Sequence, residues 1–202
     1  MKIIKKISED EMISEFLKGE VNSPRFGKKI IDSLKRDKKD KRILLNPNLN
    51  NKNENIYRKN LLGKLRGFGR NKDIFEKFPK DIKWFSAIVT KTELKKIKYI
   101  DYSYWNELSN KTRLPSIAAK NIKKGLKVYG IGNEGAFEIL AKIKKGKKFP
   151  QIILVAKNKK SKVVVLEGHA RITAYFLEQK YLPNKMEVII GYSNKISKWD
   201  LY

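Results

Sequence analysis

Cysteine is absent from this chain of 202 residues, and histidine occurs only once, as His169. Without cysteine the chain forms no disulfide and offers neither a thiolate nucleophile nor a sulfur ligand for zinc. Long apolar runs are also missing, and a membrane-spanning helix needs roughly 20 such residues. The N-terminal residues Met1–Lys6 are followed by acidic residues and not by the apolar segment of a secretory signal. We therefore expect a cytoplasmic protein without a membrane partner.

Acidic residues are scarce as well: 21 Asp and Glu stand against 47 Lys and Arg, which gives a net charge of +26. A charge of this size favours a polyanionic partner, either a nucleic acid or a nucleotide. Lysine is nevertheless spread along the whole chain beside many Asn and Ile residues, as expected for a general compositional bias with a solvated lysine surface. The charge alone leaves both interpretations open.

The most informative stretch predicts a buried strand at Val163–Leu166, a tight turn at Gly168 and a helix from Ala170 onward. A strand that runs directly into a helix leaves the first helical N–H groups free. These donors and the positive end of the helix dipole suit a phosphate. Gly168 lets the backbone approach a ligand closely, and Arg171 adds a planar set of donors.

The same stretch resembles a known superfamily. Glu-Gly-His-Ala-Arg-Ile-Thr-Ala-Tyr, which begins at Glu167, is similar to the signature of the ParB N-terminal domain and sulfiredoxin superfamily. The free-serine kinases of that superfamily, with Asp-Gly-His-His-Arg, are the most similar. The resemblance also includes Ile139–Gly146, Lys148–Val155, Leu182–Pro183 and Met186–Ile190, and covers roughly residues 127–192. Sulfiredoxin chemistry is excluded, because it needs a cysteine where this chain has His169.

The resemblance implies nucleotide binding, with Mg²⁺ and ATP or CTP as cofactors and phosphoryl transfer as the reaction. The expected nucleotide contacts come from Gly168, His169, Ala170, Arg171 and Thr173. The expected catalytic residues are Glu134, His169 and Glu167, with Glu167 as the Mg²⁺ ligand where the kinases have Asp. Glu134 is the candidate general base, although it equally fits an ordinary first-turn acid that complements a helix dipole. Ala170 replaces the second histidine of the kinase motif, so part of that machinery is absent.

The first half of the chain lies outside the resemblance and is mainly helical by its pattern. Ser8 and Glu11 form a capping box before an apolar helical stripe. Further elements are predicted as helices at Ser23–Leu34, Glu54–Leu65, Ile117–Leu126 and Asn133–Lys145, and strands at Trp84–Thr90 and Met186–Ile190. Arg58, Arg66 and Arg70 cluster around the third helix, where pairing with acids in the core is favoured over a phosphate grip. The aromatic cluster at Tyr102, Tyr104 and Trp105 is typical of a core or a seam between two parts.

The predicted fold class is α+β: a helical N-terminal part with one or two strands, residues 1–115, beside a small mixed-sheet domain of the ParB/sulfiredoxin type, residues 116–202. The function predicted first is a nucleotide-binding phosphotransferase or NTPase. The alternatives are a nucleotide-gated, DNA-binding ParB-like protein and a non-catalytic binding or adaptor module.

Overall fold

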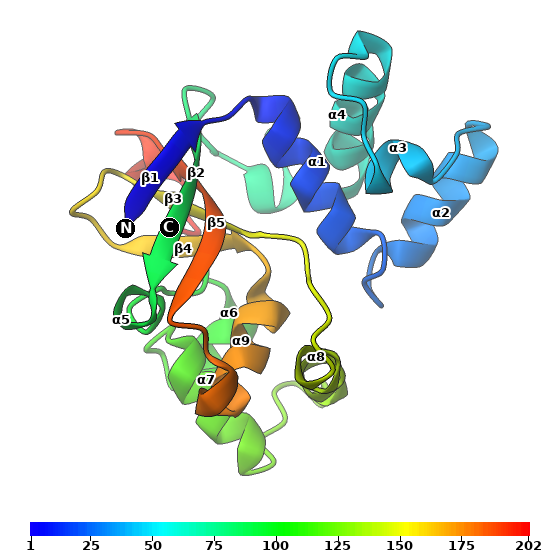
Figure 1. Ribbon diagram of the computed structural model, residues 1–202. Helices are drawn as coiled ribbons and strands as arrows, with labels where there is room; N and C mark the ends of the chain where they lie inside the picture. Colours follow the sequence, from blue (N-terminus) through cyan, green and yellow to red (C-terminus); the bar gives the residue numbers. More distant parts are fainter.

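Nine α-helices and one five-stranded mixed sheet make up the fold, so the predicted α+β class is confirmed (Figure 1). The structure is a computed structural model that describes residues 1–202. The strands are β1 (Lys2–Lys6), β2 (Lys83–Thr90), β3 (Ile152–Ala156), β4 (Val163–Glu167) and β5 (Lys185–Tyr192). The helices are α1 (Glu9–Glu20), α2 (Gly27–Arg36), α3 (Arg42–Leu45), α4 (Lys52–Arg66), α5 (Lys91–Leu94), α6 (Ser103–Leu108), α7 (Pro115–Lys123), α8 (Glu134–Lys144) and α9 (His169–Leu177). None of these helices combines the length and the apolar character that crossing a membrane requires.

The sheet has the strand order β1-β2-β5-β3-β4. β3 and β4 form an antiparallel hairpin, whereas β3 and β5 are parallel. Parallel strands need a long crossover connection, and β4 and α9 together form the connection from β3 to β5. β1 and β2 complete the sheet as antiparallel neighbours on the other side of β5.

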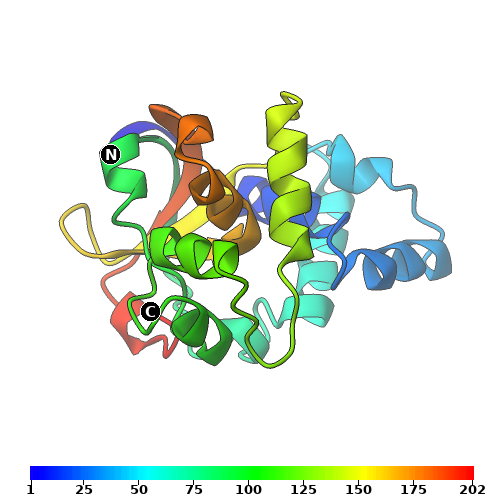
Figure 2. The same ribbon diagram turned by 90° about the horizontal axis from the view of Figure 1, so that it is seen from below.

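Each central strand supplies side chains to two separate apolar cores, because successive strand residues point to opposite faces. In β3, Ile153 and Val155 belong to the core under α1–α4, while Ile152, Leu154 and Ala156 belong to the core under α5–α9. The sheet is therefore a central layer with a group of helices on either side (Figure 1). α9 itself lies against α7 and α8 on the second face (Figure 2).

The capping signals in the sequence are confirmed for α1 and in part for α4. Ser8 and Glu11 form the complete capping box of α1. α4 begins at Lys52, earlier than predicted, because Asn51 accepts the backbone N–H of Glu54. It ends at Gly67, whose φ of 85° places it in the left-handed conformation of a helix C-cap.

Two predicted helix boundaries are wrong. The helix predicted from Ser23 begins at Gly27, since the Ser23 hydroxyl accepts the N–H of Phe26 and holds the intervening residues in a turn. The helix predicted to reach Leu126 ends at Lys123, where Gly125 with its φ of 84° turns the chain away.

The sheet does not divide at residue 115, the predicted boundary between two parts. β1 and β2 lie in the predicted first part. β2 pairs with β5 of the second part, and β1 pairs with β2. β1 was not predicted from the sequence, because the strand is rich in lysine and most of its side chains are exposed. An edge strand of this kind is held mainly by its backbone hydrogen bonds, so it leaves no apolar pattern to recognise.

Candidate functional site

The predicted strand–glycine–helix turn is present. β4 ends at Glu167, Gly168 has the left-handed angles φ 100° and ψ 21°, and α9 begins at His169. A Cβ atom at Gly168 would lie 3.1 Å from Cγ1 of Ile152, so both the angle and the space favour glycine. No side chain caps α9, and the first bond of the helix runs from Ile172 N–H to the Gly168 carbonyl at 2.9 Å. The preceding amides of α9 therefore have no acceptor within the protein.

Arg171, a predicted ligand contact, makes its hydrogen bonds within the protein. Its guanidinium is buried, and it donates to the Pro150 carbonyl, to the Gln151 carbonyl at 3.2 Å and to the carboxylate of Glu167. The pair with Glu167 lies against Gly19 of α1, where an added Cβ would be 2.8 Å from Nη2 of Arg171. Burial lowers the pKa of Arg171 to about 10, which still leaves it protonated at neutral pH. Arg171 and Glu167 thus join α1 to the turn.

Thr173 also has internal partners in place of the predicted ligand. Its hydroxyl lies 2.5 Å from the Tyr99 hydroxyl and donates to the His169 carbonyl at 2.7 Å. Both side chains are buried, so this pair fixes α9 against the segment that precedes α6. Of the predicted contacts, Ala170 is exposed and Gly168 is buried.

His169 packs in a cluster with the rings of Tyr99 and Trp105. Its ring centroid is 5.1 Å from that of Trp105 with an interplanar angle of 14°, and Trp105 stacks on Tyr99 at 4.5 Å. Burial, and secondly the positive charge of Arg66, lower the pKa of His169 to about 3, so the imidazole is neutral at pH 7. Its Nε2 atom is buried and has no hydrogen-bond partner. A neutral histidine of this kind holds an unused hydrogen-bonding position inside the protein.

Arg66 lies at the end of α4. Its sequence context predicted a structural role, but its surroundings make it a candidate for ligand binding. Its Nη1 lies 3.5 Å from a carboxylate oxygen of Glu20, and its guanidinium carbon lies 4.4 Å above the ring of Phe26. Its Nε, however, is buried and has no partner. Burial lowers the pKa of Arg66, and Arg25 adds to this through like-charge repulsion, while Glu20 opposes it.

Arg58, by contrast, is a structural arginine as predicted. It is fully buried and donates to the carbonyls of Ile43 at 2.9 Å and Asn48 at 3.2 Å. Its ion pair with Glu54 within α4 measures 3.3 Å. Arg58 therefore joins α4 to the preceding loop, although its Nε, like that of Arg66, is buried without a partner. Arg66 differs in its partner, because Glu20 follows Gly19, which contacts the Arg171–Glu167 pair at the α9 turn.

Glu134 lies at the first position of α8, where its carboxylate is exposed. Burial raises the pKa of Tyr104, and the negative charge of Glu134 raises it further. Tyr104 in turn packs edge-on against Trp105, with ring centroids 4.9 Å apart. Glu134 and His169 therefore both lie near the aromatic cluster that contains Tyr104 and Trp105.

No group of three or more His, Asp or Glu side chains in the chain is arranged to hold a metal ion. The carboxylate of Glu167, the predicted Mg²⁺ ligand, is only 12% exposed and is paired with Arg171. A role of Glu167 in metal binding therefore requires this ion pair to open.

Comparison with known proteins finds no family model, no curated protein and no solved structure that matches this chain. The resemblance to the ParB and sulfiredoxin superfamily stays a prediction that rests on the motif from Glu167 to Tyr175 and the segments around it.

Proposed function

We propose that this protein binds the phosphate groups of a nucleotide at the N-terminus of α9. One observation carries the proposal: Nε2 of His169, the first residue of the uncapped helix α9, is buried without a hydrogen-bond partner. Nε of Arg66 is also buried without a partner, and Arg66 pairs with Glu20, next to the glycine that contacts the α9 turn. A buried polar group without a partner costs about 1–3 kcal/mol, more when it is charged. Two such groups beside an uncapped helix N-terminus are accounted for by a ligand that accepts hydrogen bonds and carries negative charge.

A phosphate oxygen suits these groups better than a neutral acceptor does. The free amides of α9 donate to it, and the helix dipole and the Arg66 guanidinium both favour a negative charge. Arg25 adds positive charge from the neighbouring turn. The nucleobase has an exposed aromatic surface available at Tyr102, which is 46% exposed.

Binding is supported more strongly than catalysis. Phosphoryl transfer rests on positioned charges and on a base near the acceptor, and Glu134 is the acid that remains available for this role. Glu167 is engaged by Arg171, and Arg171 is engaged by carbonyls of the chain. We therefore propose a phosphate-binding site on a ParB/sulfiredoxin-like strand–turn–helix unit, with phosphotransfer by Glu134 as a dependent hypothesis.

A binding titration monitored by the single histidine tests the proposal. The ¹H–¹³C signal of the His169 ring is followed while ATP, CTP or inorganic phosphate is added, with and without Mg²⁺. We expect at least one nucleotide to shift this signal saturably and to raise the pKa of His169 above its value of about 3, because a bound phosphate stabilises the imidazolium.

Arg66→Gln and Arg70→Gln provide a matched pair, since Arg70 is exposed in the same segment. Loss of a charge-assisted bond should weaken nucleotide binding about 10-fold to 100-fold in the Arg66 variant and little in the Arg70 variant. The proposal is refuted if the His169 signal ignores every nucleotide at millimolar concentration, or if both variants bind as tightly as the parent. If a nucleotide does bind, release of inorganic phosphate by the parent protein tests catalysis. Loss of this release in Glu134→Gln would support the role of Glu134.

Binding to DNA is a second candidate, favoured by the net charge of +26. Charge-driven binding to duplex DNA weakens steeply with salt. A gel shift with a plain duplex that disappears at about 100 mM salt leaves only weak, non-specific attraction. If a nucleotide strengthens binding at that salt concentration, a nucleotide-gated DNA-binding role is supported.

A further inference from the structure

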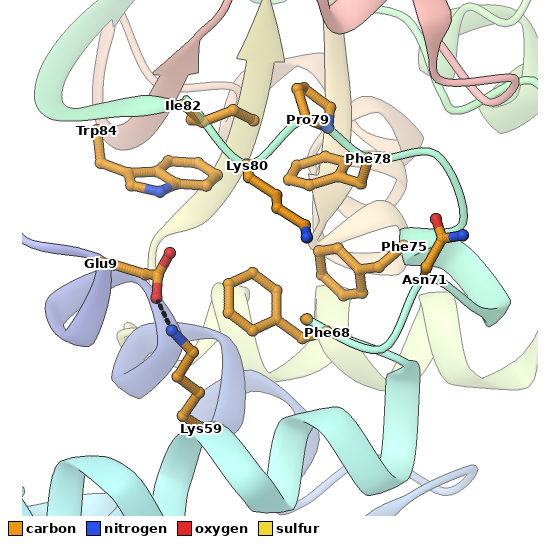
Figure 3. Close-up of a pocket in the computed structure, with 11 residues that line it drawn as sticks. Glu9, Lys59, Phe68, Asn71, Phe75, Phe78, Pro79, Lys80, Ile82 and Trp84 are labelled. Atoms are coloured by element: carbon orange, nitrogen blue, oxygen red, sulfur yellow. Dashed lines mark hydrogen bonds and ion pairs between the residues drawn. The ribbon is translucent and has the colours of Figure 1, made fainter.

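A cavity of about 630 Å³ lies away from the α9 turn, between α1, α4 and the loop that leads to β2 (Figure 3). Glu9 stands at its edge and Gly19 contacts the α9 turn, ten residues further along α1. At about 1.5 Å per residue the two sites are roughly 15 Å apart. The volume falls within the range of about 300–1,000 Å³ that is usual for small-molecule sites.

Five of the eleven residues that line the cavity have apolar side chains, namely Phe68, Phe75, Phe78, Ile82 and Trp84. Phe75 contacts Phe68 and Phe78 edge-on, each at a centroid distance of 5.0 Å. Figure 3 shows these rings and the indole of Trp84 around one central space. Aromatic rings arranged in this way favour a flat, apolar ligand, which meets ring faces and edges on several sides.

The loop that presents the rings has an unusual backbone. Gly67 and Gly69 have positive φ, and so do the non-glycine residues Asn71, Asp73 and Lys77, with φ of 51°, 52° and 56°. Positive φ is uncommon outside glycine and costs free energy that the surrounding structure has to offset. The phenylalanines are therefore held in position before any ligand arrives.

The charged groups of the cavity are two lysines and one glutamate. Figure 3 shows the amino group of Lys80 directed between the aromatic rings, and no carboxylate pairs with it. Lys59 at the edge is paired with Glu9 at 2.6 Å. Trp199 donates its indole N–H to the Ile74 carbonyl, whereas Trp84 makes no such bond. A lysine ammonium directed between aromatic rings suits one anionic group at the end of an apolar body.

We propose that this cavity binds a small aromatic carboxylate, with the ring system between Phe68, Phe75, Phe78 and Trp84 and the carboxylate on Lys80. The site is independent of the phosphate site on α9. The aromatic body supplies most of the binding through buried apolar area, and Lys80 orients the ligand and selects for its negative charge.

The test uses the full chain with 2-naphthoate and its uncharged analogue 2-naphthamide as probes. The three tryptophan indole N–H signals are followed by NMR, with Trp84→Phe to assign one of them. We expect 2-naphthoate to shift the Trp84 signal saturably and to leave His169 unchanged, and 2-naphthamide to bind more weakly. Lys80 is exposed, so Lys80→Gln should weaken 2-naphthoate binding about threefold to fivefold.

Lys83→Gln is the matched control, because Lys83 is an exposed lysine on β2 that does not line the cavity. It should bind 2-naphthoate as the parent does. A Trp84 signal that ignores millimolar 2-naphthoate overturns the proposal. Equal binding of the two probes, or equal weakening in the two lysine variants, overturns the assignment of the site to anions. Neither result bears on the His169 titration, so the two sites are tested separately.

Discussion

Acidification should destabilise this protein through its single histidine. The folded protein holds His169 with a pKa of about 3, whereas the ordinary value is 6.5. Between these two values the unfolded chain binds a proton that the folded protein excludes. The free energy of unfolding must therefore decrease as the pH falls through this window, and the effect is absent above the upper value.

The size of this effect follows from the same two values. Lowering the pH from about 7.5 to about 5 protonates His169 in the unfolded chain and leaves it neutral in the folded protein. The expected loss is roughly 2 kcal/mol, and the slope approaches about 1.4 kcal/mol per pH unit. Carboxylates with lowered pKa, such as Asp37 and Glu178, lose their stabilising contacts mainly at lower pH, because their ordinary values lie near 4.

Urea unfolding followed by tryptophan fluorescence at both pH values measures the loss, with His169→Phe as the comparison. Phenylalanine keeps a ring stacked on Trp105 and removes both the titrating group and the unpartnered nitrogen. We expect the variant to lack the pH dependence and to be at least as stable as the parent at pH 5. If the parent and the variant lose the same free energy between the two pH values, His169 is not held neutral by burial and the reasoning fails.

Further predictions concern backbone positions and the buried ion pair. Gly19→Ala should destabilise the protein by about 1–2 kcal/mol, because its Cβ meets the Arg171 pair, whereas Gly135→Ala in α8 has open space and should stabilise by about 0.5–1 kcal/mol. Gly67→Ala should cost several times more than Gly125→Ala: both have positive φ, but only at Gly67 would the Cβ collide with a backbone carbonyl. Arg171→Met should cost about 3–5 kcal/mol by leaving a buried carboxylate unpaired. Chemical unfolding measures the change in the free energy of unfolding for each variant. A stabilising Gly19→Ala, equal costs of Gly67→Ala and Gly125→Ala, or a neutral Arg171→Met would each contradict the contact from which it was predicted.

Patterns that act over a few residues were predictable from the sequence. The capping box at Ser8, the apolar run of β4 and the turn at Gly168 depend on neighbouring residues, and the structure confirms them. The α+β class follows from the same local patterns, because periodicity distinguishes helix from strand. β1 was missed for the converse reason, since its pairing with β2 leaves no apolar alternation in its side chains.

The roles of charged residues at the turn were not predictable in this way. Arg171 was expected to contact a ligand, whereas its guanidinium donates hydrogen bonds to the Pro150 carbonyl and to Glu167, against α1. Arg66 was grouped with Arg58, although it pairs with Glu20, next to the glycine that contacts the Arg171–Glu167 pair at the turn. Each outcome depends on groups far away in the chain, and no local pattern records them.

The sequence by itself determined where the chain turns, which faces are apolar, and that a glycine joins β4 to α9, because these depend on local sterics and on side-chain hydrophobicity. Only the tertiary structure decided which polar atoms are satisfied. Hydrogen bonds and ion pairs join groups across the fold, and a buried donor is left without a partner only when several distant segments pack around it.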